Sequence, residues 1–337
     1  NPTTRYTLNM PFGIPIRINL NDESWTVQVK RTADVNGSTI EVRGSGGGVY
    51  KSQLSTSFVP SSGGTTTWTS AGDVPQIMAA ATYALDAHDG GLAGETFSFR
   101  DSVTNCPPTA GGCYDSSTDT INIGGVLDDN KFGIVHELGH AISEYANPQG
   151  MDGNCSRDAV SCPSAVAGHL TASKEYQSCA AIEGVAHAYA ALAFNDENES
   201  DCEMESHLRP DWNGDGDAFD DGEDHIFSCE GGTTATDPDV PDEDFLGARC
   251  LATGITNNRG NEHDWCRAVW DLYSDDGVNF ATFLDIWDGA NPHNWNTTGN
   301  GTGADYPASR MSTAAWNIDA ATGAAWDANA SQNGIDR

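Results

Sequence analysis

The amino-acid sequence predicts an α+β fold with two lobes, in which a β-rich N-terminal part precedes a mainly helical C-terminal part. Two observations support this class. Within residues 1–65, short runs of alternating apolar and polar residues are separated by Asn36-Gly37 and by a glycine-rich stretch, as in strands joined by hairpins. From Asp73 onward, the apolar residues instead recur at helical spacing. Strands and helices that occupy separate stretches of chain are typical of the α+β class.

Residues 66–147 are expected to form an N-terminal catalytic lobe that follows the β-rich segment. Asp73 stands where a helix N-cap belongs, and the pattern after it predicts a helix over residues 74–88. A loop with two cysteines follows. The run TINI at residues 120–123, preceded by a turn-rich stretch, then predicts a short strand directly before the next helix.

That next helix is predicted to begin after Asp128 or Asp129 and to end before Pro148 and Gly150. Its sequence is KFGIVHELGHAISEYA, with apolar residues along one face. This helix closes the N-terminal lobe.

Residues 148–337 are expected to form the helical C-terminal lobe. An alanine-rich stretch predicts a helix over residues 174–194. Residues 196–244 are dense in Asp and Glu, and Arg209 is the only Lys or Arg among them, which indicates an acidic insertion rather than core. From about residue 260 helical runs alternate with polar loops.

The charge of the chain argues against two classes of partner. The 337 residues include 49 Asp and Glu against 16 Lys and Arg, which gives a formal net charge of −33. A nucleic-acid-binding surface needs clustered basic residues, and an anionic membrane would repel this chain. We therefore expect neither nucleic acid nor a membrane as a partner.

The nine cysteines favour a protein that folds outside the cytosol. None of them forms a Cys-x-x-Cys pair, so disulfide bonds explain them better than a zinc knuckle or a thioredoxin-like redox site. Cys106 with Cys113 and Cys155 with Cys162 are spaced for short disulfide loops. Because nine is an odd number, we expect that one thiol is free or that its partner was lost with a removed segment. We expect a secreted protein.

The segment HELGH, residues 136–140, carries the strongest chemical signal in the sequence. His136 and His140 are four positions apart, so on a helix they share one face and can both reach a single zinc ion. Glu137 is offset from them, where its carboxylate can act on a water molecule that zinc activates. The alternative is an amphipathic helix with incidental histidines.

A catalytic zinc ion usually has three protein ligands, so a third ligand is expected. Glu183 is the leading candidate because it is a carboxylate on an otherwise very apolar helix and needs a strong partner there. A bland alternative is that Glu183 pairs with His187 or with an arginine. The remaining third-ligand candidates are Glu175, His169 and His207.

These residues resemble the gluzincin metallopeptidases, the group that includes thermolysin and fungalysin. The resemblance rests on HELGH, on the segment IEGVA around Glu183, and on NEHDWCRAVWDLYSDDG at residues 261–277. It implies that His136, His140 and Glu183 bind zinc and that Glu137 is the general base. This sequence departs from the pattern at His187, where the family commonly has an aspartate that orients the first zinc histidine.

Two further expectations come from the same resemblance. His263 would donate a hydrogen bond to the oxyanion of the reaction, with Arg259 as the second candidate for that role. The strand at residues 120–123 would be an edge strand that binds the substrate backbone in extended form.

A second metal site is expected in the acidic insertion. Asp211, Asn213 and Asp215 alternate before Gly216, as at the start of a calcium-binding loop, and a divalent cation would relieve the repulsion among the carboxylates. The position where an EF-hand has its last glutamate holds Gly222. A solvated acidic loop without calcium is the alternative.

The sequence therefore predicts a secreted, monomeric zinc endopeptidase that hydrolyses protein or peptide substrates and carries structural calcium. Two alternatives remain open. An aminopeptidase of the same clan is one, although the GxMEN motif of the aminopeptidase N type is absent. The other is a non-catalytic, calcium-stabilised binding module with a vestigial zinc site.

Overall fold

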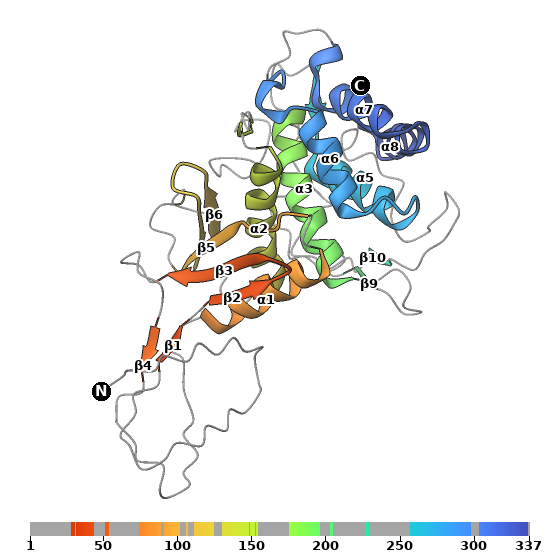
Figure 1. Cartoon of the computed structure of the whole chain (residues 1–337). Coiled ribbons are helices and arrows are strands. Elements are labelled where there is room, and N and C mark those ends of the chain that lie inside the picture. The colour runs from red at the N-terminus through yellow and green to blue at the C-terminus, as the bar shows by residue number, and fades with distance from the viewer. Residues whose placement is uncertain are drawn as a thin grey trace, which may run out of the picture.

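The computed structural model shows a mixed α/β protein (Figure 1). It describes residues 28–30, 32–43, 51–53, 74–88, 91–101, 106, 111–124, 130–147, 149–151, 153, 175–195, 203–204, 227–228, 257–297 and 303–335. The predicted calcium ligands Asp211, Asn213 and Asp215, the pair Cys155 and Cys162, and the alternative zinc ligands His169 and His207 lie outside these residues.

A five-stranded sheet forms the β part of the described chain, in the strand order β2-β3-β5-β7-β6. Strands β3, β5 and β7 run parallel to one another, whereas β2 and β6 pair antiparallel at the two edges. The strands are β2 (Thr32–Val35), β3 (Ser38–Arg43), β5 (Thr96–Asp101), β6 (Gly112–Asp115) and β7 (Thr120–Ile123). The sheet thus takes strands from both residues 1–65 and residues 66–147.

The turn between β2 and β3 follows the sequence signal. Asn36 and Gly37 have φ angles of 49° and 87°. Two successive positive φ angles are what a two-residue hairpin turn requires, and Asn followed by Gly is the pair that adopts them most easily. The Asn36 side chain also donates a hydrogen bond of 3.0 Å to the carbonyl oxygen of Leu85, which ties the turn to the neighbouring helix.

The strand predicted at residues 120–123 is confirmed, but its predicted edge position is wrong. Strand β7 lies between β5 and β6, and all four of its residues are buried. The stretch before it is a hairpin turn in which the Asp115 carboxylate accepts hydrogen bonds from Ser117 and Thr118. That turn returns the chain antiparallel, so β6 covers the outer side of β7 and takes the edge position.

Two helices pack against this sheet and against each other. The helix α1 (Val74–Ala87) contacts β2 and β3, and α2 (Lys131–Ala146) contacts β6 and β7. The N-cap of α2 is Asn130, not Asp128 or Asp129, and its side-chain oxygen accepts hydrogen bonds from the amides of Phe132 and Gly133. An N-cap oxygen satisfies two of the amides that have no partner within the helix, which fixes where α2 begins.

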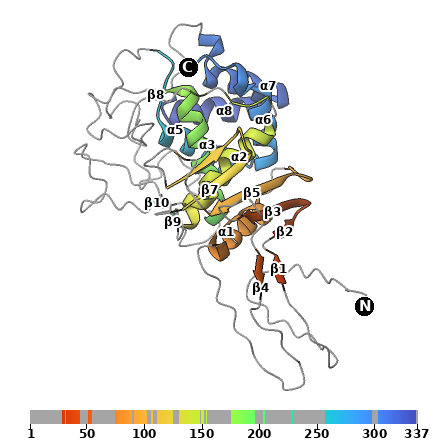
Figure 2. The same cartoon turned by 90° about the vertical axis from the view of Figure 1, so that its left-hand side faces the viewer.

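The remaining helices gather on the other side of α2, as Figure 1 and Figure 2 show. Helix α3 packs against α2 and α5, and α8 packs against both α7 and α5. The bounds are α3 (Gln177–Phe194), α5 (Glu262–Ser274), α6 (Phe280–Gly289), α7 (Pro307–Ile318), α8 (Ala320–Gln332) and the 3-10 helices η3 (Pro292–Asn294) and η4 (Gly303–Asp305). Among the described residues, the C-terminal half is mainly helical, as predicted.

Short strand pairs complete the described elements. The pair β8 (Glu175–Tyr176) and β11 (Arg259–Gly260) joins the beginnings of α3 and α5. The other pairs are β1 (Gln28–Lys30) with β4 (Lys51–Gln53), and β9 (Glu203–Met204) with β10 (Phe227–Ser228). Since residues 175 and 176 are strand, α3 begins three residues later than predicted.

One hydrophobic core runs from the sheet into the C-terminal helices. Phe99 of β5, Leu138 of α2, Tyr189 of α3, Trp265 of α5 and Trp326 of α8 all belong to it. Trp316 is the exception among the C-terminal tryptophans described, since 48% of its surface is exposed. Among the described residues, no helix is long and apolar enough to cross a membrane.

Candidate metal centre

Helix α2 brings His136 and His140 together as their spacing predicts. Their Nε2 atoms are 3.1 Å apart, and the two ring planes are nearly perpendicular, at 84°. One helical turn separates the two residues, so both imidazoles leave α2 on the same side. The two rings therefore offer two nitrogen atoms to a common point.

Helix α3 supplies the third group. The Oε2 atom of Glu183 is 3.3 Å from Nε2 of His136 and 3.2 Å from Nε2 of His140. Together the three atoms form a nearly equilateral triangle. His136 and Glu183 are buried and His140 is partly buried, so the triangle is largely shielded from solvent between α2 and α3, which pack against each other.

This triangle could hold a metal ion. In a tetrahedral site with bonds of 2.0–2.1 Å, neighbouring ligand atoms are roughly 3.3 Å apart, which is close to the three observed separations. Two imidazoles and one carboxylate, with a fourth position open, are a donor set that zinc accepts. Other first-row divalent metals bind the same donors, so the set is compatible with zinc without being specific for it.

Glycine at position 139 explains how Glu183 reaches the histidines. A Cβ atom on Gly139 would lie 2.9 Å from the Cα atom of Ala186 and 3.1 Å from its carbonyl oxygen. No side chain could fit in that space, so α2 and α3 touch backbone to backbone. Ala186 follows Glu183 by three positions, and this close approach places the short Glu183 side chain against both imidazoles.

A second glycine brings α5 to the same region. A Cβ atom on Gly184 would overlap Cβ of Trp265 and would lie 2.7 Å from the carbonyl oxygen of Glu262. Helix α3 therefore has close contacts on two sides, with α2 at Ala186 and with α5 at Gly184. The sequence IEGVA thus combines the candidate metal-binding carboxylate with the small residues that let both neighbouring helices approach.

A buried histidine and a buried glutamate lie behind the triangle. The ring of His187 packs against that of His136, with centroids 4.2 Å apart and planes inclined by 35°. The Nε2 atom of His187 is 3.2 Å from Oε2 of Glu262. Glu262 is the functional candidate that sequence reasoning missed.

Glu137, the predicted general base, is buried, with 7% of its surface exposed. It lies between the two histidines in sequence and is rotated by about 100° around α2 from His136. A general base has to remain outside the set of metal ligands, and Glu137 is not one of the three converging groups. Glu175, a weaker candidate for third ligand, is fully buried in β8 and is also outside the triangle.

His263, the predicted oxyanion donor, lies in the first turn of α5, where Asn261 caps the helix by accepting a hydrogen bond of 2.9 Å from the His263 amide. The predicted role requires a side chain that the substrate can reach, whereas only 3% of the His263 surface is exposed. Arg259, the second candidate, is partly buried in β11. Glu262, the residue before His263, contacts the His187 ring. The first turn of α5 therefore lies next to that ring.

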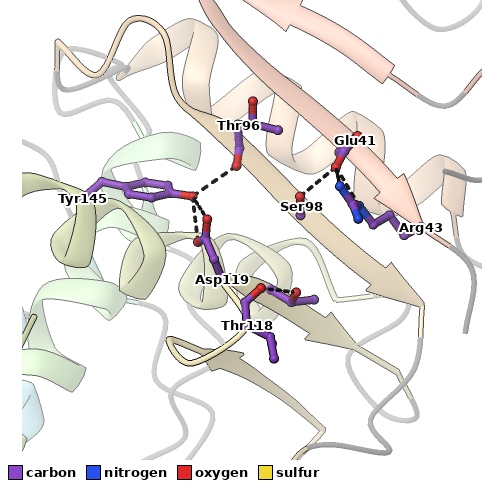
Figure 3. A network of polar contacts seen from close by, with 8 residues as sticks. Glu41, Arg43, Thr96, Ser98, Thr118, Asp119 and Tyr145 are labelled. Atoms are coloured by element: carbon purple, nitrogen blue, oxygen red, sulfur yellow. Dashed lines mark hydrogen bonds and ion pairs between the residues drawn. The ribbon is translucent and has the colours of Figure 1, made fainter. Parts of the chain in front are cut away.

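The C-terminal end of α2 is tied to the sheet (Figure 3). The Tyr145 hydroxyl contacts both carboxylate oxygens of Asp119, at 2.7 and 2.6 Å, and lies 3.1 Å from the carbonyl oxygen of Thr96. The neighbouring Glu144 has a raised pKa because it is partly buried and because Asp119 lies nearby. In the same view the Glu41 carboxylate of β3 binds Arg43 and Ser98.

The cysteines agree in part with their predicted pairing. Cys106 and Cys113 form the predicted disulfide bond, which links β6 to the chain before it. Cys179 at the start of α3 is also disulfide-bonded. Among the described cysteines, Cys266 is the free thiol, and its burial raises its pKa to about 12. A thiol in that state is protonated at neutral pH and acts as an apolar side chain.

Searches among protein-family models and among curated proteins found no match to this chain.

Proposed function

We propose that this protein is a secreted zinc endopeptidase of the gluzincin type. The observation that carries the proposal is the triangle of His136, His140 and Glu183, whose ligand atoms are 3.1–3.3 Å apart while Glu137 stands beside them on α2. Two imidazoles, one carboxylate and an adjacent second carboxylate are the groups that hydrolysis of a peptide bond requires.

Each residue has a separate task in this proposal. A zinc ion held by the triangle would polarise the scissile carbonyl group and make a water molecule acidic. Glu137 accepts the proton of that water and later passes it to the leaving amine. His263 or Arg259 donates a hydrogen bond to the oxygen that becomes negative during the reaction.

The substrate backbone would pair with β6 rather than with β7. In the described part of the chain no strand pairs with the outer side of β6, and α2 packs directly against this strand. An extended peptide that adds to β6 would run beside the metal helix. The Cys106–Cys113 disulfide holds this strand in place and supports a secreted location.

The first experiment is to measure metal content together with cleavage. Elemental mass spectrometry of protein purified without chelators should give about one zinc per chain. An internally quenched peptide blocked at both ends should be cleaved internally. A chelator should abolish the cleavage, and added zinc should restore it.

The blocked peptide also separates the alternatives. An aminopeptidase would require a free N-terminus and would leave this peptide intact. A protein that binds zinc and cleaves neither blocked nor unblocked peptides would be a binding module, and the proposal would be rejected. The variant Glu183→Gln is the control, because it should lose both zinc and cleavage.

A further inference from the structure

The ring of His187 stands between a metal-binding histidine and a buried carboxylate. On one side its centroid is 4.2 Å from that of His136. On the other side its Nε2 atom is 3.2 Å from Glu262 Oε2. The side chains of His187 and Glu262 are 5% and 1% exposed, so almost no water reaches either group.

The burial of Glu262 calls for a physical reason. A carboxylate that is taken out of water is costly unless it accepts hydrogen bonds from a suitable donor. The imidazole N–H of His187 is such a donor, and a hydrogen bond to a carboxylate is stronger than one between neutral groups. His187 on α3 and Glu262 on α5 are 75 positions apart in the sequence. They can meet only because α3 and α5 pack closely at Gly184.

The contact with Glu262 also limits how the His187 ring can turn. A ring held at one edge by a hydrogen bond presents a fixed face to its neighbour. That face packs against His136 at an inclination of 35°, which restricts rotation of the His136 side chain about its own bonds.

We propose that His187 and Glu262 are positioning residues, which hold the imidazole of His136 in its metal-binding orientation and thereby set the affinity of the site for its metal. The inference rests on the proposed metal site. It assigns a role to two residues that touch neither the metal nor the substrate. Partners behind a metal ligand typically change metal affinity by about 10–100-fold when they are removed.

The test uses variants that separate packing from hydrogen bonding. His187→Ala removes both the ring and the donor. His187→Phe keeps a ring against His136 but cannot donate to Glu262. Glu262→Gln keeps an acceptor without the charge, and it is the mildest of the three changes. Circular dichroism and thermal unfolding of the metal-free proteins show which variants fold.

The main readout is the zinc dissociation constant, measured by competition with a chromogenic chelator. We expect an increase of about 10–100-fold for His187→Ala and a smaller increase for His187→Phe and Glu262→Gln. The visible absorption spectrum of the cobalt-substituted protein gives a second readout, because it reports ligand geometry without any catalysis. The spectrum of His187→Ala should differ from that of the wild type.

His88→Phe is the matched control. His88 is a partly buried histidine that packs against Tyr273 and donates a hydrogen bond of 3.0 Å to the carbonyl oxygen of Leu192, near the other end of α3. Its replacement should lower thermal stability while leaving the zinc dissociation constant within about twofold of wild type.

The outcomes distinguish this inference from the proposed function. A wild-type protein that binds no zinc overturns both. If the wild type binds zinc and cleaves the blocked peptide while folded His187→Ala and Glu262→Gln keep the wild-type affinity and cobalt spectrum, only the positioning role is rejected. If His187→Ala does not fold, His187→Phe and Glu262→Gln decide together, because wild-type affinity and a wild-type cobalt spectrum in both folded variants overturn the inference.

Discussion

At the scale of single residues, the separation between ligand and base is what matters for the proposed chemistry. His136 and His140 aim their Nε2 atoms at a common point with Glu183, and Glu137 is kept out of that group by the pitch of α2. Because Glu137 is buried, its carboxylate is largely shielded from bulk water.

Replacing Glu137 with Gln should separate metal binding from catalysis. The amide cannot accept the proton of the attacking water, so cleavage should fall by a factor of about 10² to 10⁴ while zinc content stays at the wild-type value. The measurement is kcat/KM on the blocked peptide together with elemental analysis. Glu144→Gln, on the same helix, is the control and should retain activity. Full activity in Glu137→Gln would reject the mechanism.

The residues of the triangle could be predicted from the sequence because each has a local signal. His136 and His140 have the spacing of one helical turn, and Glu183 is a carboxylate on an alanine-rich helix. Glu262 has no such signal. Its partner His187 is 75 positions away, and an acidic residue in the first turn of a helix is common without any further role.

At the scale of elements, the site depends on how closely α2 and α3 approach each other. The separation of ligand atoms on two helices is set by the distance between the helix axes, and here Gly139 faces the backbone of Ala186. A larger residue at either position would move the Glu183 carboxylate away from the imidazoles.

Gly139→Ala should therefore weaken both the fold and the metal site. The added methyl group would meet backbone atoms that cannot turn aside, so we expect unfolding to become easier by about 1–3 kcal/mol. The zinc dissociation constant should rise together with this loss. Gly303→Ala is the control, because a Cβ atom there has no neighbour within 4 Å, and its effect should stay within about 0.5 kcal/mol. Equal stability of the two variants in chemical denaturation would contradict this account.

The helices could be predicted well from the sequence, whereas the sheet could only be predicted in part. Helical periodicity and caps are local, so α1, α2 and α3 were expected within a few residues of their observed bounds. Strands β5 and β6 were not expected, and the region was interpreted as a loop. A strand of four to six residues has a weak pattern, and its place in a sheet depends on partners far away in the sequence. The same reason explains the wrong edge position of β7.

At the scale of the whole molecule, α5 connects the site with the C-terminal end of the described chain. Its first turn carries Glu262, and its C-terminal end, with the residues just after it, makes polar contacts with the C-terminal end of α8. Asn333 donates a hydrogen bond of 2.6 Å to Asp271, and Asn329 donates one of 2.9 Å to Asp276. Burial raises the pKa of Asp271 to about 6, with Asp275 and Asp276 adding to the effect and Asn333 and Arg267 opposing it.

This raised pKa predicts a specific dependence of stability on pH. An aspartate in the unfolded chain has a pKa near 4, so below about pH 4 Asp271 is protonated in both the folded and the unfolded state. The contribution of protonated Asp271 to the free energy of unfolding is then fully present. It is lost as the pH rises through about 6, the pKa in the folded protein. Asp271→Asn has no charge to bury. At pH 7 it should be more stable than wild type by an amount of the order of 2 kcal/mol, and near pH 4 the two should be equal.

Urea denaturation of both metal-free proteins between pH 4 and pH 8 checks this prediction. The useful quantity is the difference between the two unfolding free energies, because groups that titrate in both proteins cancel. A difference that does not change with pH would show that Asp271 ionises in the folded protein as it does in the unfolded chain.

The tie between α2 and the sheet has a consequence in alkaline solution. Tyr145 donates a hydrogen bond to Asp119 (Figure 3), and Tyr114 donates another to the same carboxylate. Loss of either phenolic proton would place a second negative charge beside Asp119. Partial burial and the charge of Asp119 raise the pKa of both phenols above their ordinary value of 10.0.

The unfolded chain therefore loses these two protons before the folded protein does. The stability they contribute is present below about pH 10 and falls as the pH rises further. In an absorbance titration of phenolate, two of the nine tyrosines should ionise at the pH at which the C-terminal end of α2 is released from the sheet. Above that pH the protein would lose the anchorage of its candidate metal centre.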